Sequence, residues 1–327
     1  MHKHPMTIGQ LIRSPAMRLL FLITLLIIAI ALYLTWDMKA SLAFTLKYRS
    51  KKLATLLIVG TAVAISTVLF QTLTENKILT PGIMGFDSLY VLVQGLLVLT
   101  LGVSGFNSFN PYVKWVAETS LMIACTALLY RMFFRQSSQS LQFLLLAGIV
   151  LGILFSSASG LVFRLLDPTE FSVLQDSLFA SFSMVDPTML AISIVVIATL
   201  VFYIWRKHAI LDVMLLGRHC ATNLGVNLNR MTKELLVIVA ILVSVSTALV
   251  GPITFFGLLV AHLAYRLAAT YQHKFLLPSA ALLGMLVLVV GDFSLQHIFS
   301  FSTQLSIIIE LFGGICFLAL IMYREKT

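Results

Sequence analysis

The stretch KYRSKKLATLLIVGTAVAISTVLF, Lys47 to Phe70, joins a cluster of cations to a long apolar run. Four of its first six residues are Lys or Arg, and the eighteen residues from Leu53 onward carry no charge. A helix rises about 1.5 Å per residue, so a bilayer core about 30 Å thick is crossed by about 20 apolar residues. The stretch therefore predicts a membrane-spanning helix that follows a strongly basic loop.

The rest of the chain has the same character. Of its 327 residues, 59% are apolar and only 11% are charged, and the mean hydropathy is +1.00. A soluble core cannot bury that much apolar surface, so the composition indicates a polytopic membrane protein. The net charge of +9 comes from basic residues spread over short loops without an aromatic platform, which argues against nucleic-acid binding.

Ten apolar segments are long enough to be spans. Period-2 alternation is absent, and within a bilayer a helix satisfies its backbone polar groups inside one segment. We therefore predict an all-α protein that forms a single transmembrane domain over residues 1–327. The predicted spans are 18–35, 53–72, 83–102, 113–133, 141–162, 188–205, 233–250, 254–271, 276–293 and 304–322.

The distribution of Lys and Arg predicts the orientation. With the N-terminus inside, the inner side receives fifteen of these cations and the outer side seven. Both termini are therefore predicted to be cytoplasmic. Five of the seven outer cations lie between Lys39 and Lys52, against the general bias. We interpret them as a docking patch for an acidic partner; the alternative is that they only cap a helix.

The one long inner loop, 206–234, has apolar residues at both ends of a short polar stretch. Its glycines predict two short surface helices joined at Gly225, a compact knob suited to a socket. The alternative is an ordinary solvated loop. On the outer side, the repeated Asp-Pro-Thr motif at Asp167 and Asp186 predicts the start of a short external helix and of the sixth span.

Several kinds of chemistry have no sequence signal. There is no GxxxxGK[ST] loop for nucleotide, no catalytic constellation and no paired cysteine motif. We therefore expect no enzyme activity, no metal site and no cofactor bound by this chain. The ionisable residues within the spans lie near span ends, a poor basis for a proton relay. They are Asp87, Glu118, Arg266, Asp292 and Glu310.

Four stretches, in order along the chain, resemble the FecCD-type permeases of iron-siderophore, haem and cobalamin importers. They are the segment from Arg49 to Gly85, the segment LLGRHCATNLGVN, the segment GPITFFGLLVAHLAYRLA, and the last two spans. The chain departs from the family pattern where Lys51 and Lys52 replace Pro and Arg, and where Ala261 replaces the Pro before a histidine. The matching motif positions are Gln71, Asn76, Pro81, Gly85, Gly251, Pro252, Gly257, His262 and Arg266.

This resemblance implies the type II ABC importer permease fold, in a bacterial inner (plasma) membrane. It implies that an external binding protein docks on Arg49, Lys51 and Lys52. It also implies that two cytoplasmic ATPase subunits, which use ATP and Mg²⁺, seat the coupling segment. The residues of that segment are Gly217, Arg218, Ala221, Leu224, Gly225 and Val226.

The expected cargo is a ferric siderophore, and the expected second permease subunit is a different chain, with a homodimer as the alternative. The alternative function is a secondary transporter or channel that needs no ATPase.

Overall fold

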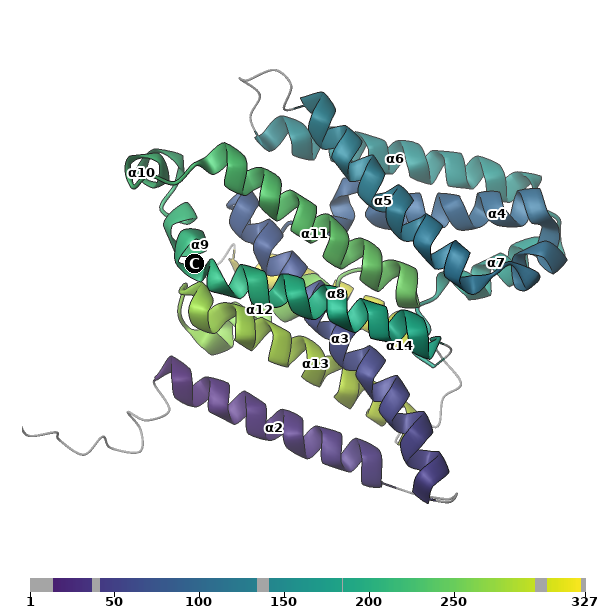
Figure 1. Cartoon of the computed structure of the whole chain (residues 1–327), viewed down its shortest axis with the longest axis horizontal. Coiled ribbons are helices and arrows are strands. Elements are labelled where there is room, and N and C mark those ends of the chain that lie inside the picture. The colour runs from purple at the N-terminus through teal and green to yellow at the C-terminus, as the bar shows by residue number, and fades with distance from the viewer. Residues whose placement is uncertain (1–13, 37–41, 134–140, 184, 298–304, 325–327) are drawn as a thin grey trace, which may run out of the picture.

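The computed structural model describes residues 14–36, 42–133, 141–183, 185–297 and 305–324, and over these ranges it is helical without strands (Figure 1). Seven of the described helices are long and apolar enough to cross a membrane. The elements are α2 (Pro15–Thr35), α3 (Leu42–Thr74), the 3₁₀ helix η1 (Pro81–Met84), α4 (Phe86–Ser108), α5 (Pro111–Phe133), α6 (Leu141–Leu165), α7 (Pro168–Leu178), α8 (Pro187–Arg206), α9 (His208–Met214), α10 (Arg218–Asn223), α11 (Leu228–Val250), α12 (Phe256–Ala268), α13 (His273–His297) and α14 (Leu305–Arg324).

Each of the ten predicted segments falls on a helix, so the prediction of an all-α membrane protein is confirmed. The length predicted for the eighth segment is wrong. α12 has only 13 residues, about 20 Å at helical rise, and cannot cross a bilayer core alone. Both of its ends are left-handed, with φ of 58° at Phe255 and 44° at Ala269, so the backbone leaves the helix there despite the apolar sequence.

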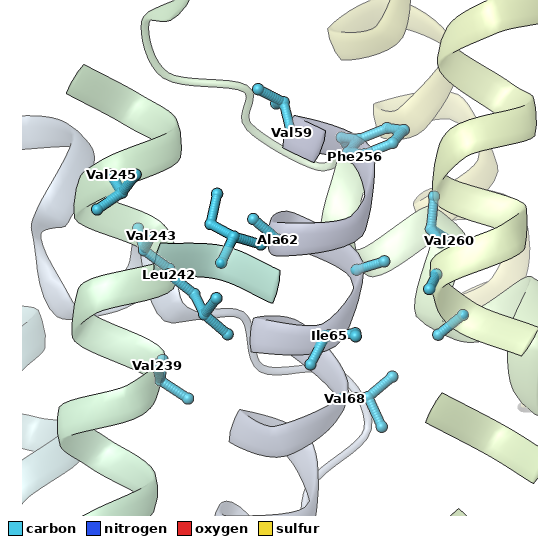
Figure 2. Close-up of a cluster of buried hydrophobic side chains, with 14 of the residues drawn as sticks. Val59, Ala62, Ile65, Val68, Val239, Leu242, Val243, Val245, Phe256 and Val260 are labelled. Carbon is cyan, nitrogen blue, oxygen red and sulfur yellow. The ribbon is translucent and has the colours of Figure 1, made fainter. Parts of the chain in front are cut away.

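α3 lies at the centre of the bundle and packs against α13, α11, α12 and α8. In the most apolar stretch of α3, 78% of the residues are buried, whereas in the most apolar stretch of the peripheral α2 only 17% are buried. Figure 2 shows part of the resulting core, in which α3 lies between aliphatic side chains of α11 on one side and Phe256 and Val260 of α12 on the other. α3 is thus the helix around which the other spans are arranged.

Two glycines let α3 and α13 approach closely. A Cβ atom added at Gly60 would lie 2.7 Å from the backbone carbonyl of Gly284, closer than real Cβ atoms come to other atoms. Helices in membranes associate largely through such close packing of small residues, since lipid is as apolar as their side chains. The same device joins α6 to the start of α4, where Gly152 contacts Gly85 and Gly148 contacts Met84.

The prediction that both Asp-Pro-Thr motifs begin helices is confirmed, whereas the external position of the first helix stays a prediction. Asp167 caps α7 in a capping box with Glu170, and α7 packs against α4. Asp186 caps α8 by accepting from the amides of Thr188 and Met189. These caps satisfy amides that have no partner within their helices.

We predict that Gly60→Val lowers the free energy of unfolding by about 1–3 kcal/mol, because the added side chain must push α3 away from α13. Thermal unfolding of the purified protein in detergent measures this. Gly160→Val is the matched control, since a Cβ at Gly160 of α6 meets nothing within 4 Å. Equal melting temperatures for the two variants would contradict the packing argument.

Candidate functional site

The basic stretch before the second span is helical, so its prediction as a loop is wrong. α3 begins at Leu42, and Lys47 to Lys52 form its early turns. Lys and Arg are good helix formers, and no Gly or Pro occurs between Leu42 and Val59. The helix therefore continues beyond the apolar run that hydropathy detects, and its cations point to different sides.

Arg49 points toward the end of α2. Its Nη1 donates to the carbonyl oxygens of Tyr33 at 3.2 Å and Trp36 at 2.5 Å, with a longer contact to Leu34. The last carbonyls of a helix have no partner within the helix and carry partial negative charge. Arg49 therefore stabilises the end of α2 and holds it against α3.

Lys52 forms a largely buried ion pair with Asp292 of α13. Its Nζ lies 2.9 Å from Asp292 Oδ1, and the two side chains are 13% and 6% exposed. The other carboxylate oxygen accepts from the Tyr33 hydroxyl at 2.8 Å and from the Gln296 amide at 2.5 Å. The carboxylate thus ties α2, α3 and α13 together at the end of the bundle where α3 begins.

Of the cations in this stretch, Lys47 is exposed and Lys51 is partly exposed. Arg49 donates hydrogen bonds to carbonyl oxygens of the same chain, and Lys52 forms an ion pair within it. Whether Arg49, Lys51 and Lys52 also meet a docking protein stays a prediction.

We predict that Lys52→Met destabilises the protein by about 3 kcal/mol, because it leaves the buried Asp292 carboxylate without its cation. Adding Asp292→Asn should restore most of the loss, since the amide oxygen still accepts from Tyr33 and carries no charge. Thermal unfolding of the single and double variants measures the coupling. A double variant no more stable than Lys52→Met would contradict the ion-pair argument.

A cavity of about 450 Å³ lies between α3, η1, the start of α4, the end of α11 and the start of α12. Its wall is mostly apolar and carries several hydroxyls and the Asp87 carboxylate. Ser66, Thr67 and Ser246 donate to carbonyl oxygens of their own helices. The cavity is therefore a weakly polar space in the membrane-spanning part of the chain.

Three of the predicted motif positions, Pro81, Gly251 and Gly257, line this cavity. Gly251 has a φ of +102° and packs against the backbone of Ala180, so a side chain there would be both strained and crowded. Gly257 allows α12 to contact Thr67 of α3. Pro252 follows Gly251 in the extended segment that leads into α12.

Gln71 and Asn76 shape the turn after α3. The buried Gln71 amide donates to the carbonyl of Lys77 at 2.8 Å, and Asn76 accepts from the amide of Ile78 at 3.0 Å. Lys77 then lies over the rings of Tyr265 and Tyr271, at 4.8 and 4.6 Å from their centroids. This turn is thereby attached to the end of α12.

The remaining motif positions lie elsewhere. Gly85, with a φ of +86°, ends η1 and begins α4. His262 is partly buried in the middle of α12, and Arg266 is exposed in its last turn. The structure therefore does not gather the nine motif residues at one place.

The long inner loop forms the two short helices α9 and α10, but they are not joined at Gly225 as predicted. They are joined through Leu215 to Gly217, and Gly225 connects α10 to α11. Gly217 and Gly225 have φ of +87° and +81°, and both turns need this left-handed backbone, which glycine adopts without strain. Both glycines are turn residues, so the sequence alone does not indicate which of the two turns separates α9 from α10.

This pair of helices and the turn after them, residues 208–226, form a knob. Ala221 is fully buried and its carbonyl accepts from the amide of Val226, which closes the turn after α10. Leu216 and Leu224, by contrast, are 60% and 62% exposed. Arg218 is the first residue of α10. The knob therefore presents two exposed leucines beside a turn closed by a backbone hydrogen bond.

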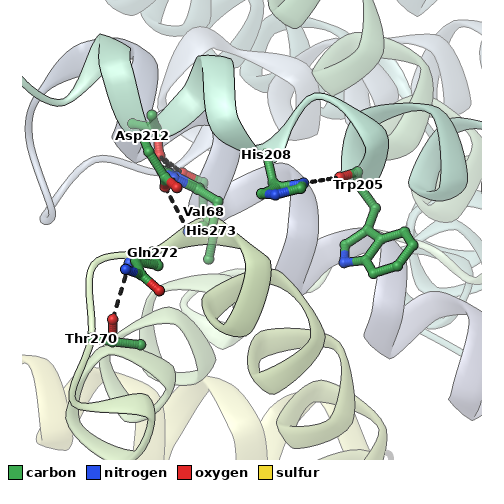
Figure 3. A network of polar contacts seen from close by, with 8 residues as sticks. Val68, Trp205, His208, Asp212, Thr270, Gln272 and His273 are labelled. Carbon is green, nitrogen blue, oxygen red and sulfur yellow. Dashed lines mark hydrogen bonds and ion pairs between the residues drawn. The ribbon is translucent and has the colours of Figure 1, made fainter. Parts of the chain in front are cut away.

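A buried histidine anchors the knob to the spans (Figure 3). Asp212 of α9 lies 2.7 Å from both the backbone amide and the Nδ1 of His273, the first residue of α13. The Nε2 of His273 lies 2.8 Å from the hydroxyl of Thr72 in α3. Sequence reasoning missed this contact because Asp212 and His273 are 61 residues apart and belong to no common motif.

An all-helical bundle whose long apolar helices surround a weakly polar cavity is that of a polytopic membrane protein. The sequence profile of the FecCD transport family matches residues 16–323, so the chain belongs to this family.

Curated relatives agree with this assignment. The chain is 41% identical over 311 residues to the petrobactin import system permease protein YclO of Bacillus subtilis, covering 95% of this chain and 98% of the relative. It is 38% identical over 279 residues to the petrobactin import system permease protein FatC of Bacillus anthracis, covering 85% and 79%.

A solved structure described as an inward-facing conformation of a metal-chelate type ABC transporter superposes with a TM-score of 0.82 at 23% identity. It covers 94% of this chain and 99% of that chain. The fold is therefore that of an ABC transporter permease.

Proposed function

We propose that this chain is the membrane-spanning subunit of an ATP-driven importer for a ferric siderophore. The observation that carries the proposal is the identity of 41% over nearly the whole length with a protein named as a petrobactin import permease. A second relative, FatC, is also named as a petrobactin import system permease protein, and the family match points in the same direction. Ferric petrobactin is accordingly the first cargo to test.

The knob and its anchor suit the coupling role that we assign to Gly217, Arg218, Ala221, Leu224, Gly225 and Val226. Exposed leucines at the tip can enter an apolar groove of an ATPase, while Asp212 and His273 connect the base of the knob to α13. A movement of the ATPase would then reach the spans through the contact of Asp212 with His273 and through the packing of α9 against α3, α8 and α13. We propose that two such ATPases hydrolyse ATP with Mg²⁺ and that this chain binds no nucleotide or metal itself.

The cavity between α3, α4, α11 and α12 is the proposed contribution of this chain to the cargo route. We propose that the pathway is shared with a second permease subunit. We propose a different chain as that subunit, with a second copy as the alternative. An external binding protein would deliver the cargo at the start of α3, with both termini in the cytoplasm of a cell bounded by this inner (plasma) membrane.

The deciding experiment is reconstitution in proteoliposomes with the partner ATPase, the second permease and the binding protein. We expect uptake of ⁵⁵Fe-petrobactin only with ATP and binding protein present. Uptake by this chain alone, driven by an ion gradient, would instead establish the alternative, a secondary transporter or channel.

In the same system we predict that Leu224→Asp lowers both uptake and cargo-stimulated ATP hydrolysis by about tenfold or more, because it places a charge in an apolar contact. Leu224→Met keeps the contact apolar and is the matched control. If both variants transport like the wild type, the knob does not seat the ATPase.

For the docking surface, we predict that Lys47→Glu with Lys51→Glu weakens capture of the binding protein by about tenfold at low salt, and less at high salt. These two lysines leave the internal contacts of Arg49 and Lys52 intact. The control is Arg206→Glu with Lys274→Glu, two exposed cations at the other end of the bundle. Equal capture by both double variants would place docking elsewhere.

A further inference from the structure

Two hollows lie along one flank of α2. The first, of about 690 Å³, lies between the start of α2 and the end of α12 and is lined by Arg18, Arg266 and apolar residues. The second, of about 700 Å³, lies between the later part of α2 and α13 and is almost entirely apolar. Neither hollow includes any residue of the cavity assigned to cargo.

The two hollows follow one stripe of α2, and we treat them together as one groove. The lining residues Arg18, Phe21, Leu25, Ile28 and Leu32 are spaced alternately by three and four positions. This spacing places them in one stripe along the helix. At 1.5 Å per residue the stripe extends about 20 Å, which is about the length of an extended acyl chain.

Among the residues that line the two hollows, the cations are Arg18 and Arg266, and both belong to the hollow beside the end of α12. Arg18 donates to the carbonyl of Leu267 at 3.2 Å, which places it beside the end of α12, and the exposed Arg266 is in the last turn of the same helix. None of the described residues that line either hollow is acidic. The groove is therefore apolar along its length and positively charged at its mouth.

This charge distribution fits one class of ligand, an amphiphile with an anionic head and a long apolar tail. We propose that the groove is a binding site for an anionic phospholipid, whose phosphate lies between Arg18 and Arg266 and whose acyl chain follows α2. The planar guanidinium group of arginine can donate two parallel hydrogen bonds to phosphate oxygens. An apolar groove of matching length accommodates the acyl chain of the same lipid. The charged end of the groove is predicted to lie at the cytoplasmic surface, where anionic lipids attract basic residues, and this position agrees with the proposal.

The same mouth is close to the turn that Lys77 fixes on Tyr265 of α12. A lipid bound there would hold the start of α2 against the short helix α12, where few other contacts join these two elements. We therefore expect the bound lipid to raise the melting temperature of the protein.

The test uses the full chain in nanodiscs and native mass spectrometry of the protein released from them. We expect the wild type to retain phosphatidylglycerol and not phosphatidylcholine, and Arg18→Gln with Arg266→Gln to reduce the retained lipid by about tenfold. The matched control is Arg206→Gln with Arg230→Gln, two exposed arginines outside the groove. Equal loss in both double variants would mean that the lipid responds only to total charge and would overturn the proposal.

Ile28→Trp provides a second arm that leaves both arginines in place. The larger side chain fills the groove at mid-length, so it should also reduce phosphatidylglycerol retention. If the lipid were held by its headgroup alone, retention would be unchanged, and that result would overturn the assigned acyl path. If the arginine variant does not fold, titration of the wild type with each lipid still decides, because equal retention of both lipids, or no rise in melting temperature with phosphatidylglycerol, contradicts the site.

Discussion

The contact between Gly60 and Gly284 sets the distance between α3 and α13, and much of the structure depends on it. In a bilayer, apolar side chains gain little by leaving lipid for protein, so helices associate where their backbones can come close enough for dense packing. With α13 held against α3, α12 reaches α3 through Gly257, and α11 packs on the opposite side. The core in Figure 2 forms where the neighbouring helices pack against α3.

Polar contacts fix the two ends of this central pair. Where α3 begins, Asp292 of α13 accepts from Lys52 and from Tyr33 of α2. Where α3 ends, His273 at the start of α13 joins Thr72 of α3 to Asp212 of the knob. A buried charge or histidine is costly without a partner, so each contact also disfavours sliding of the helices past one another.

These end contacts bear directly on the proposed transport cycle. Alternating access requires the spans to move relative to one another while the bundle stays intact, and the cargo cavity lies between the central helix and the segments around η1 and α12. Those segments contain several left-handed residues, Gly85, Gly251 and Phe255 among them. The closely packed pair α3 and α13 therefore borders short segments of irregular backbone, an arrangement that allows local movement beside a well-packed element.

The linear sequence was sufficient for the helical class, the positions of the apolar segments, both Asp-Pro-Thr caps and the family. Each of these rests on local composition or spacing, which the chain carries without regard to what packs against it. It was insufficient for the short length of α12, which depends on left-handed backbone at Phe255 and Ala269, and for the helical state of the basic stretch, which hydropathy does not register.

Tertiary structure alone decided which side chains meet. Lys52 and Asp292 are 240 positions apart, and so nothing local to either residue predicts their ion pair. The partnership of Asp212 with His273 and the groove between Arg18 and Arg266 arise in the same way. In each case the physical reason is that burial and distance, which fix the partner of a charge, exist only once the helices have packed.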